Sequence, residues 1–276
     1  MRFAIALCLV LSCAMIPSAA QDNPPAGAKP SALDEILDVY VRDGLVYYRA
    51  LKLERKRLDG YVTSLADTAI DSRSREERLA FWLNAYNALV LKTVIDHYPI
   101  PRQTKDYPDR SIRQIPGAFE RVQHRVGGRM LTLDGIEQTI LAAFRDPRVY
   151  LAIGRGAMGS GRLRSEAFAP ALLETQLSEV AAECVNRAEC MEIDHVNNRV
   201  AISSIFSWRS PDFVGAYAGD GGGAFGARSP IERATLAFVQ PRLLATEKAF
   251  LTQNEFQVVF KPFDWSLNDL TGRGGR

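Results

Sequence analysis

One stretch of the chain constrains its fold more than any other: REERLAFWLNAYNALVLKTVIDH, residues 75–97. Its apolar residues recur at helical spacing and cover almost the whole circumference of a helix. The pattern ends just before Tyr98-Pro99, because the residue that precedes a proline avoids helical geometry. A helix that is apolar on nearly all sides needs neighbours on all sides, so the sequence predicts a buried central helix here.

The rest of the chain reads as short helices and short strands in irregular order. Helical spacing predicts helices at 31–41, 51–67, 133–144, 171–184, 206–213 and 230–250. Strand patterns and turn residues predict a short strand beginning at 44, hairpins at 121–132 and 192–203, strands at 148–153 and 256–266, and a solvent loop at 219–230. There is no regular βαβ alternation. We therefore expect an α+β fold, a predominantly helical single domain with small antiparallel β-hairpins or sheet.

The N-terminus has the pattern of a secretory signal peptide. Arg2 is followed by an apolar run from Phe3 to Ile16 that is too short to be a good membrane span. The small residues Ser18 and Ala20 fit a cleavage site before Gln21. The sequence therefore predicts export, to a bacterial periplasm, and no transmembrane segment in the mature protein.

A lipoprotein signal ending at Cys13 is the less favoured alternative, because the apolar run continues after that cysteine. The residues that follow the cleavage site are rich in proline, glycine and polar side chains. We expect the following organisation: a signal peptide at 1–20, a flexible leader at 21–30, one domain at 31–270 and a disordered tail at 271–276.

Composition excludes some classes of protein. The chain has 276 residues, 47% of them hydrophobic, so it can bury a full core without a metal or disulfide to hold it together. Its net charge is +2 with both signs mixed throughout, and we expect no nucleic-acid partner. The three histidines, His97, His124 and His195, are not spaced as metal ligands, so we expect no metal site.

Two cysteines, Cys184 and Cys190, remain after removal of the signal peptide. In an oxidising compartment such a pair can close a small loop, and we expect a disulfide between them. Two free cysteines, or a functional pair, are the alternatives.

The stretch from Gly154 to Gly159, GRGAMG, matches the G-x-G-x-x-G spelling of a dinucleotide-binding turn. Such a turn needs a helix that opens at its third glycine and an acidic residue at the end of a following strand. Neither is present, so we expect no nucleotide and no other cofactor. What remains is a glycine-rich turn that carries Arg155, Arg162 and Arg164, whose guanidinium groups suit a carboxylate or phosphate. Alternatively, these arginines pair with acidic side chains such as Glu166.

Asn84 and Asn87 lie three residues apart, so both amides project from one face of the central helix. Buried amides need hydrogen-bond partners. They either tie the helix to the backbone of a neighbouring loop or line a pocket.

Several motifs, taken in series, resemble the domain-of-unknown-function family 547 (DUF547). FWLNAYNALVLKTVIDHYPI resembles the central helix of that family, VGGRMLTLDGIEQTIL its hairpin and helix, VAISSIFSWRSPDF an internal segment and FDWSLN a closing strand. The similarity covers roughly residues 35–270 in the same order. The resemblance implies an architecture more than a reaction, because the activity of the family is not established.

The chain departs from the family pattern at the positions that suggest chemistry. The family usually carries a Cys-x-x-x-x-Cys-Pro-Pro-Leu turn, and the alignment puts Arg155 and Ser160 at the two cysteine positions. It also usually carries Glu-His in the helix after the hairpin, where this chain has Glu137 and Gln138. A cysteine activated by a histidine is a plausible nucleophile in typical members. This chain is thus a divergent member that lacks both.

Three functions remain open. The leading hypothesis is a binding protein or pseudoenzyme, with a pocket made by Asn84, Asn87 and the Gly154–Arg164 turn, in which Arg155 and Arg162 hold an anionic or peptide-like ligand. The alternative is a hydrolase or acyl-transferase with Ser160 as nucleophile, the amides of the turn as oxyanion hole, and Glu137 and Gln138 as orienting residues. The third is a structural or interaction role in the cell envelope.

Overall fold

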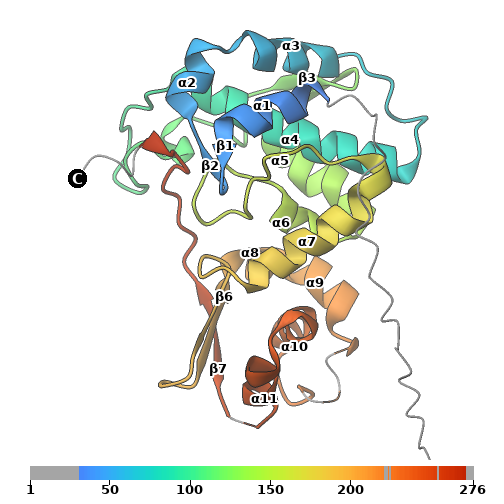
Figure 1. Ribbon diagram of the computed structural model, residues 1–276, viewed down its shortest axis with the longest axis vertical. Helices are drawn as coiled ribbons and strands as arrows, with labels where there is room; N and C mark the ends of the chain where they lie inside the picture. Colours follow the sequence, from blue (N-terminus) through green and yellow to red (C-terminus); the bar gives the residue numbers. More distant parts are fainter. Residues whose placement is uncertain (1–30, 221–222, 224, 254, 272–276) are drawn as a thin grey trace, which may run out of the picture.

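The computed structural model describes residues 31–220, 223, 225–253 and 255–271. The predicted signal peptide and leader lie outside these residues, as does the predicted tail beyond residue 271. The predicted α+β class, with helices predominating, is confirmed (Figure 1).

The central helix α4 (Arg75–His97) has the bounds that the sequence predicts. Ser74 caps it: the Ser74 hydroxyl accepts the N–H of Glu77, and the Glu77 carboxylate accepts the N–H of Ser74. Most of its residues from Leu79 onward are buried, and neighbouring segments contact it on several sides. The prediction of a buried central helix is therefore confirmed.

The other elements are short. The remaining helices are α1 (Ala32–Tyr40), α2 (Tyr48–Leu53), α3 (Lys56–Leu65), α5 (Leu133–Gly135), α6 (Val149–Ala152), α7 (Leu173–Val185), α8 (Ser204–Trp208), α9 (Ser210–Tyr217), α10 (Pro230–Val239) and α11 (Ala245–Gln253). In the described residues, 3₁₀ turns and a π-helical segment join them: η1 (Ile112–Gln114), η2 (Ile136–Leu141, the π segment), η3 (Ala142–Phe144), η4 (Pro170–Leu172) and η6 (Gln240–Arg242). The strands are β1 (Val41–Arg42), β2 (Leu45–Val46), β3 (His124–Val126), β4 (Arg129–Leu131), β5 (Met191–Asp194), β6 (Arg199–Ser203) and β7 (Gln257–Lys261).

The largest sheet has the order β5-β6-β7. The hairpin β5–β6 is antiparallel, with Met191 opposite Ile202, as the sequence predicts. Strand β7 pairs in parallel with β6, with Ile202 opposite Phe260, because the chain passes through α8 to α11 before it returns. Helices α9, α10 and α11 lie beside this sheet in the lower part of Figure 1.

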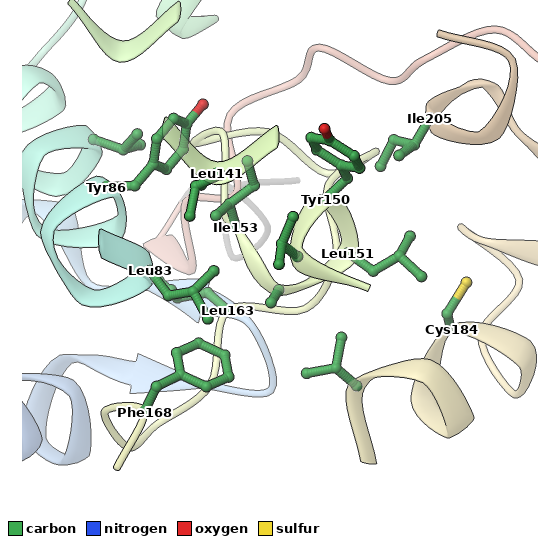
Figure 2. Close-up of a cluster of buried hydrophobic side chains, with 14 of the residues drawn as sticks. Leu83, Tyr86, Leu141, Tyr150, Leu151, Ile153, Leu163, Phe168, Cys184 and Ile205 are labelled. Carbon is green, nitrogen blue, oxygen red and sulfur yellow. The ribbon is translucent and has the colours of Figure 1, made fainter. Parts of the chain in front are cut away.

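The predicted strand at 148–153 is wrong, because this segment contains helix α6. Its residues are apolar on every side, and periodicity alone cannot separate a short buried strand from a short buried helix. Tyr150 and Leu151 of α6 are buried in the core together with Leu83 and Tyr86 of α4 (Figure 2).

Two loop predictions need smaller corrections. The predicted strand at 256–266 ends at Lys261, and the chain continues without regular structure. The predicted solvent loop at 219–230 contains Phe225, which is 4% exposed, so part of this segment packs into the core. Residues 221, 222 and 224 of that loop lie outside the described residues.

After β7 the chain returns to the N-terminal helices. The N–H of Val46 donates to the carbonyl of Asn268, and the N–H of Leu270 donates to the carbonyl of Val46. The Asn268 side chain accepts from the Tyr48 hydroxyl and donates to the carbonyl of Gly44. These contacts fix the segment that carries Trp265 against the first half of the chain.

None of the helices in the described part of the chain combines the length and the apolarity that a bilayer span requires.

Candidate binding pocket

The amides of the glycine-rich turn donate to acceptors within the protein. The N–H of Gly154 donates to the Asn87 side chain at 2.8 Å, and the N–H of Arg155 donates to the Ser160 hydroxyl at 2.9 Å. The amides of Met158 and Gly159 donate to the carbonyls of Ser266 and Asp264. These donors are therefore not free to hold a phosphate or an oxyanion.

Packing explains two of the glycines in this turn. Gly156 has φ of +66°, a left-handed conformation that side chains other than glycine rarely adopt. At Gly161, a Cβ atom would overlap the carbonyl oxygen of Leu151. The glycine pattern that resembles a nucleotide motif thus serves a tight connection between α6 and the loop that follows it.

The two asparagines of α4 tie this helix to loop backbone. Asn84 accepts the N–H of Phe168 at 2.8 Å and donates to the carbonyl of the same residue at 2.9 Å. Asn87 accepts the N–H of Gly154 and donates to the carbonyl of Ala152 at 3.3 Å. Both predicted pocket residues therefore have the tying role that the sequence left open, and neither lines the cavity described below.

Arg162 and Arg164 pair with acidic side chains on α7. Arg162 contacts Glu183 at 2.6 Å, and Arg164 contacts Glu179 at 2.8 Å. Arg164 also pairs with Glu166, the partner that the sequence suggested. Neither arginine shares a cavity with Arg155.

Ser160 lies in a confined place. Within the described residues, the only hydrogen bond to its hydroxyl comes from the N–H of Arg155. It borders a space of about 10 Å³, close to the minimum for one water molecule. In the part of the chain that the structure describes, no histidine or carboxylate bonds to this hydroxyl.

Arg155 and Glu137 form a buried ion pair. Nε of Arg155 donates to one carboxylate oxygen of Glu137 at 3.1 Å, and Nη2 donates to the other at 2.7 Å. The Arg155 side chain is 3% exposed and that of Glu137 is 8% exposed. The Tyr86 hydroxyl and Arg209 also donate to Glu137. Burial alone would raise the pKa of Glu137, but the charges and hydrogen bonds of the two arginines outweigh it and lower this pKa to about 2.

A cavity of about 480 Å³ opens beside this pair, a size typical of small-molecule sites. Ten residues from six segments of the chain line it: Tyr107, Arg113, Phe119, Asp134, Glu137, Gln138, Arg155, Trp208, Arg209 and Trp265. Three sequence-predicted residues, Glu137, Gln138 and Arg155, therefore meet here. Each guanidinium nitrogen of Arg155 donates within the protein, two to Glu137 and one to the carbonyl of Tyr150, and the side chain is only 3% exposed.

Two other arginines of this cavity keep unused donors. Arg209 donates to Glu137 through Nη2, and its guanidinium lies 4.5 Å from the ring centroid of Tyr150. Arg113 donates to Glu120 through Nη1. Within the described residues, Nη1 and Nε of Arg209 and Nη2 of Arg113 have no acceptor. The cavity therefore holds guanidinium N–H groups that are not committed to the fold.

Aromatic rings line the cavity beside Arg113. The Arg113 guanidinium lies 4.5 Å from the ring centroids of both Phe119 and Trp265, a cation–π arrangement that fixes its position. The rings of Trp208 and Trp265 are nearly parallel, at 20°, with centroids 6.1 Å apart. Trp208 is 47% exposed, which is high for so large an apolar side chain.

Asp134 is the second carboxylate that lines the cavity, beside Glu137. It is partly buried, and its carboxylate accepts no hydrogen bond from the described residues. Burial, then the nearby carboxylates of Glu120 and Glu137, raise the pKa of Asp134, and this effect is only partly offset by Arg113 and Arg209. The neighbouring Gln138 is exposed and can both donate and accept.

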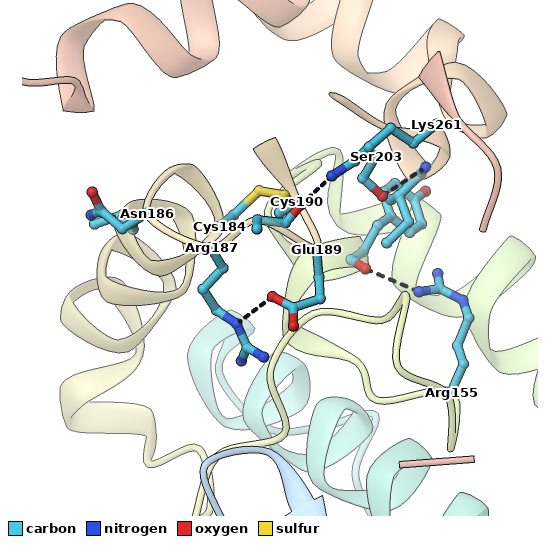
Figure 3. Close-up of a disulfide and its surroundings, with 12 residues drawn as sticks. Arg155, Cys184, Asn186, Arg187, Glu189, Cys190, Ser203 and Lys261 are labelled. Atoms are coloured by element: carbon cyan, nitrogen blue, oxygen red, sulfur yellow. Dashed lines mark hydrogen bonds and ion pairs between the residues drawn. A yellow bond between two sulfur atoms is a disulfide. The ribbon is translucent and has the colours of Figure 1, made fainter. Parts of the chain in front are cut away.

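The disulfide lies outside this cavity. Cys184, near the end of α7, is bonded to Cys190, just before β5 (Figure 3). The N–H of Ser203 donates to the carbonyl of Cys190 at 2.7 Å, and Lys261 donates to the carbonyl of Ala188. The bond thus ties α7 to the β5-β6-β7 sheet. Within the described residues, no group of His, Cys, Asp and Glu could hold a metal ion.

The sequence did not single out most of the cavity wall. Trp208 and Arg209 lie in the SSIFSWRSPDF segment and Trp265 in FDWSLN, two segments that the family resemblance marked for architecture alone. The adjacent Trp208 and Arg209, at the end of helix α8, were the one local pattern that could have indicated a binding site. Arg113 gave no signal, because its environment depends on Trp265, far along the chain.

Comparison with curated proteins and with solved structures gives no match. Comparison with family models gives a match over residues 70–185, to the family described as "Protein of unknown function, DUF547". The matched segment contains α4, Glu137, Gln138 and Arg155. The comparison therefore supports a DUF547 assignment for residues 70–185 of this chain.

Proposed function

We propose that the chain is an exported binding protein or pseudoenzyme, whose cavity beside Arg155 and Glu137 holds a small ligand by a carboxylate or another anionic group. The observation that carries the proposal is the pair Arg113 and Arg209. Both guanidinium groups line the same cavity, and each has N–H donors without an acceptor among the described residues. Guanidinium donors that are held in place bind carboxylates well, because their geometry is prepared before the ligand arrives.

The anion site that we propose differs from the one that the sequence suggests. Arg155 is buried and its donors are used, so it acts as support for Glu137. Arg162 and Arg164 serve ion pairs with α7. In our proposal Arg113 and Arg209 bind the ligand in their place.

The term pseudoenzyme rests on the family resemblance. That resemblance aligns Arg155 with a cysteine and Gln138 with a histidine, and both residues border the cavity. The guanidinium group of Arg155 is not a nucleophile. The side-chain amide of Gln138 cannot act as a general base that takes a proton from a nucleophile. These replacements favour binding over covalent catalysis in the cavity.

The Ser160 hydrolase has less support. Its hydroxyl accepts the Arg155 amide, adjoins a space of about one water molecule and lacks a base among the described residues. The amides of Gly154, Met158 and Gly159, which could otherwise stabilise an oxyanion, donate to acceptors within the fold. Labelling of Ser160 by a fluorophosphonate probe would overturn our preference for binding.

Thermal melting with a ligand panel tests the proposal. The mature chain is melted with glutamate, citrate, N-acetylalanine and phosphate, at low ionic strength because charge–charge attraction is screened by salt. We expect at least one anion to raise the melting temperature, because a ligand that binds only the folded state stabilises it, and the shift should grow with ligand concentration. The shift should be lost in Arg113→Gln and in Arg209→Gln.

Arg129→Gln is the matched control, because Arg129 pairs with Asp71 on the exposed β3–β4 hairpin and does not line the cavity. It should keep the full shift. Equal shifts in all variants, or no shift with any anion, would refute the proposed site. Because Arg209 also supports Glu137, Arg113→Gln decides the question if Arg209→Gln folds poorly.

Export is tested separately. Residues 1–20 support it by their charge, apolar run and small residues before Gln21. We expect the mature protein to begin at Gln21 and to be recovered in the periplasmic fraction. A chain that keeps Met1 and stays in the cytosol would contradict this part of the proposal.

A further inference from the structure

We infer that the ligand of this cavity is a carboxylated saccharide, whose sugar ring lies against Trp208 and Trp265 and whose carboxylate binds Arg113 and Arg209. The inference rests on the proposed function and names its ligand class. It comes from the juxtaposition, in one cavity, of an exposed aromatic surface and guanidinium groups with unused donors.

The aromatic surface consists of Trp208, Phe263 and Trp265. Phe263 contacts both tryptophans, with its ring centroid 4.8 Å from that of Trp208 and 4.4 Å from that of Trp265. Trp208 and Trp265 both line the cavity, and Trp208 is 47% exposed. The face of an aromatic ring is electron-rich, and it attracts the polarised C–H groups on the apolar face of a pyranose. The exposed indole of Trp208, which stacks beside the partly buried Trp265, therefore suits a sugar ring.

The polar groups of the cavity match a ligand rich in hydroxyls. A hydroxyl both donates and accepts, so it needs partners of both kinds. Asp134 supplies an acceptor that no described residue uses, and Gln138 supplies both an amide donor and an acceptor. Arg113 and Arg209 supply donors. A site for a simple anion would not need Asp134 and Gln138.

An extended peptide fits this cavity less well. Peptides often bind by adding a strand to an exposed sheet edge, where main-chain groups give the affinity. All ten lining residues lie in helices, turns or loops, and none belongs to a strand of the described chain. A nucleotide is also disfavoured, because the amides of Gly154, Arg155, Met158 and Gly159 in the glycine-rich turn already donate within the protein.

Isothermal titration of the mature chain tests the inference. The probes are trigalacturonate and N-acetylmuramic acid, which represent uronate polysaccharides and peptidoglycan as two sources of a carboxylated sugar. Maltotriose is the neutral sugar control and triglutamate the acidic peptide control. We expect one or both acidic sugars to bind at least tenfold more tightly than either control. Which of the two binds identifies the source.

Variants of Trp208 test the stacking. Trp208→Ala should weaken binding of the acidic sugar at least tenfold. Trp208→Phe keeps an aromatic face and should restore most of the affinity, which separates stacking from a general loss of structure. Tyr47→Ala removes another exposed aromatic side chain, outside the cavity, and should bind like the wild type.

The outcomes separate this inference from the proposed function. If small carboxylates bind but neither acidic sugar exceeds triglutamate, the saccharide inference is overturned and the anion-binding function stands. Unchanged sugar affinity in Trp208→Ala would also overturn it. If no anion binds at all, both proposals are refuted.

Discussion

Arg155 donates to both carboxylate oxygens of Glu137, from Nε at 3.1 Å and from Nη2 at 2.7 Å. Its remaining terminal nitrogen, Nη1, donates to the carbonyl of Tyr150 at 3.2 Å. The pair is almost fully buried and forms the floor of the cavity. At the position where the family resemblance implies a cysteine, this chain thus has a structural ion pair, and the residues that can still act on a ligand lie around it.

Glu137→Gln should destabilise the protein strongly. The variant leaves Arg155 buried without a counter-charge, which typically costs about 3–5 kcal/mol. Urea unfolding at neutral pH measures the loss. Glu120→Gln is the matched control, because Glu120 pairs with Arg113 with half of its side chain exposed, and such a pair contributes about 1 kcal/mol or less. Similar losses in the two variants would contradict the structural role of the buried pair.

Asn87→Ala should destabilise the protein and leave the ligand-induced shift of the melting temperature unchanged. The substitution leaves the N–H of Gly154 and the carbonyl of Ala152 without their buried partner, at about 1–3 kcal/mol for each group. Asn197→Ala, in the exposed β5–β6 turn, should cost far less. A variant that melts like the wild type but loses the ligand-induced shift would instead make Asn87 a ligand-binding residue.

His124 should make stability depend on pH. Burial, together with the charge of Lys92, lowers the pKa of His124 to about 4, and Asp96 offsets this only in part. Because the folded-state pKa is below that of the unfolded chain, stability is full above about pH 6.5 and falls as the pH drops towards 4, by up to roughly 3 kcal/mol. His124→Gln should flatten this part of the profile. His195→Gln, at an exposed position, serves as control, and an unchanged slope in His124→Gln would disprove the assignment.

Asp134→Asn should strengthen binding of a small carboxylate at pH 7. Asp134 lines the cavity, where burial and then Glu120 and Glu137 raise its pKa and Arg113 and Arg209 lower it, and its ionised form repels an anionic ligand. Removal of one nearby like charge is worth roughly 1 kcal/mol, or about fivefold in affinity. In the wild type, binding should tighten as the pH falls towards the raised pKa of Asp134, and the variant should lose that dependence.

Titration calorimetry with the tightest anion of the panel measures the effect. Asp71→Asn, in the loop before α4 and outside the cavity lining, should behave like the wild type. Weaker binding by Asp134→Asn would show that the carboxylate of Asp134 helps to hold the ligand.

The sequence predicts the helical frame well where a local pattern is strong. Helix α4 has both a capping box at Ser74 and apolar residues on nearly every side, so its bounds follow from local information. The segment 148–153 fails for the opposite reason. It is short and uniformly apolar, and only its packing against α4 and α7 decides between helix and strand.

The candidate site could be predicted only in part. Glu137, Gln138 and Arg155 stand out because they replace or accompany residues that the family pattern suggests. Their partners come from distant segments: Arg209 lies more than fifty residues after Arg155. Trp265 is held at the cavity by long-range bonds, those of Asp264 and Ser266 to the glycine-rich turn and that of Asn268 to Tyr48. Which arginine is buried and which keeps free donors depends on this tertiary arrangement, and no local pattern contains it.

A crystal structure of the mature chain with a carboxylate ligand tests the central claim most directly. We predict the carboxylate within hydrogen-bond distance of Arg113 and Arg209, with the Arg155–Glu137 pair unchanged beneath it. A ligand bound by Arg162 and Arg164, or a carboxylate that displaces Glu137 from Arg155, would contradict the account.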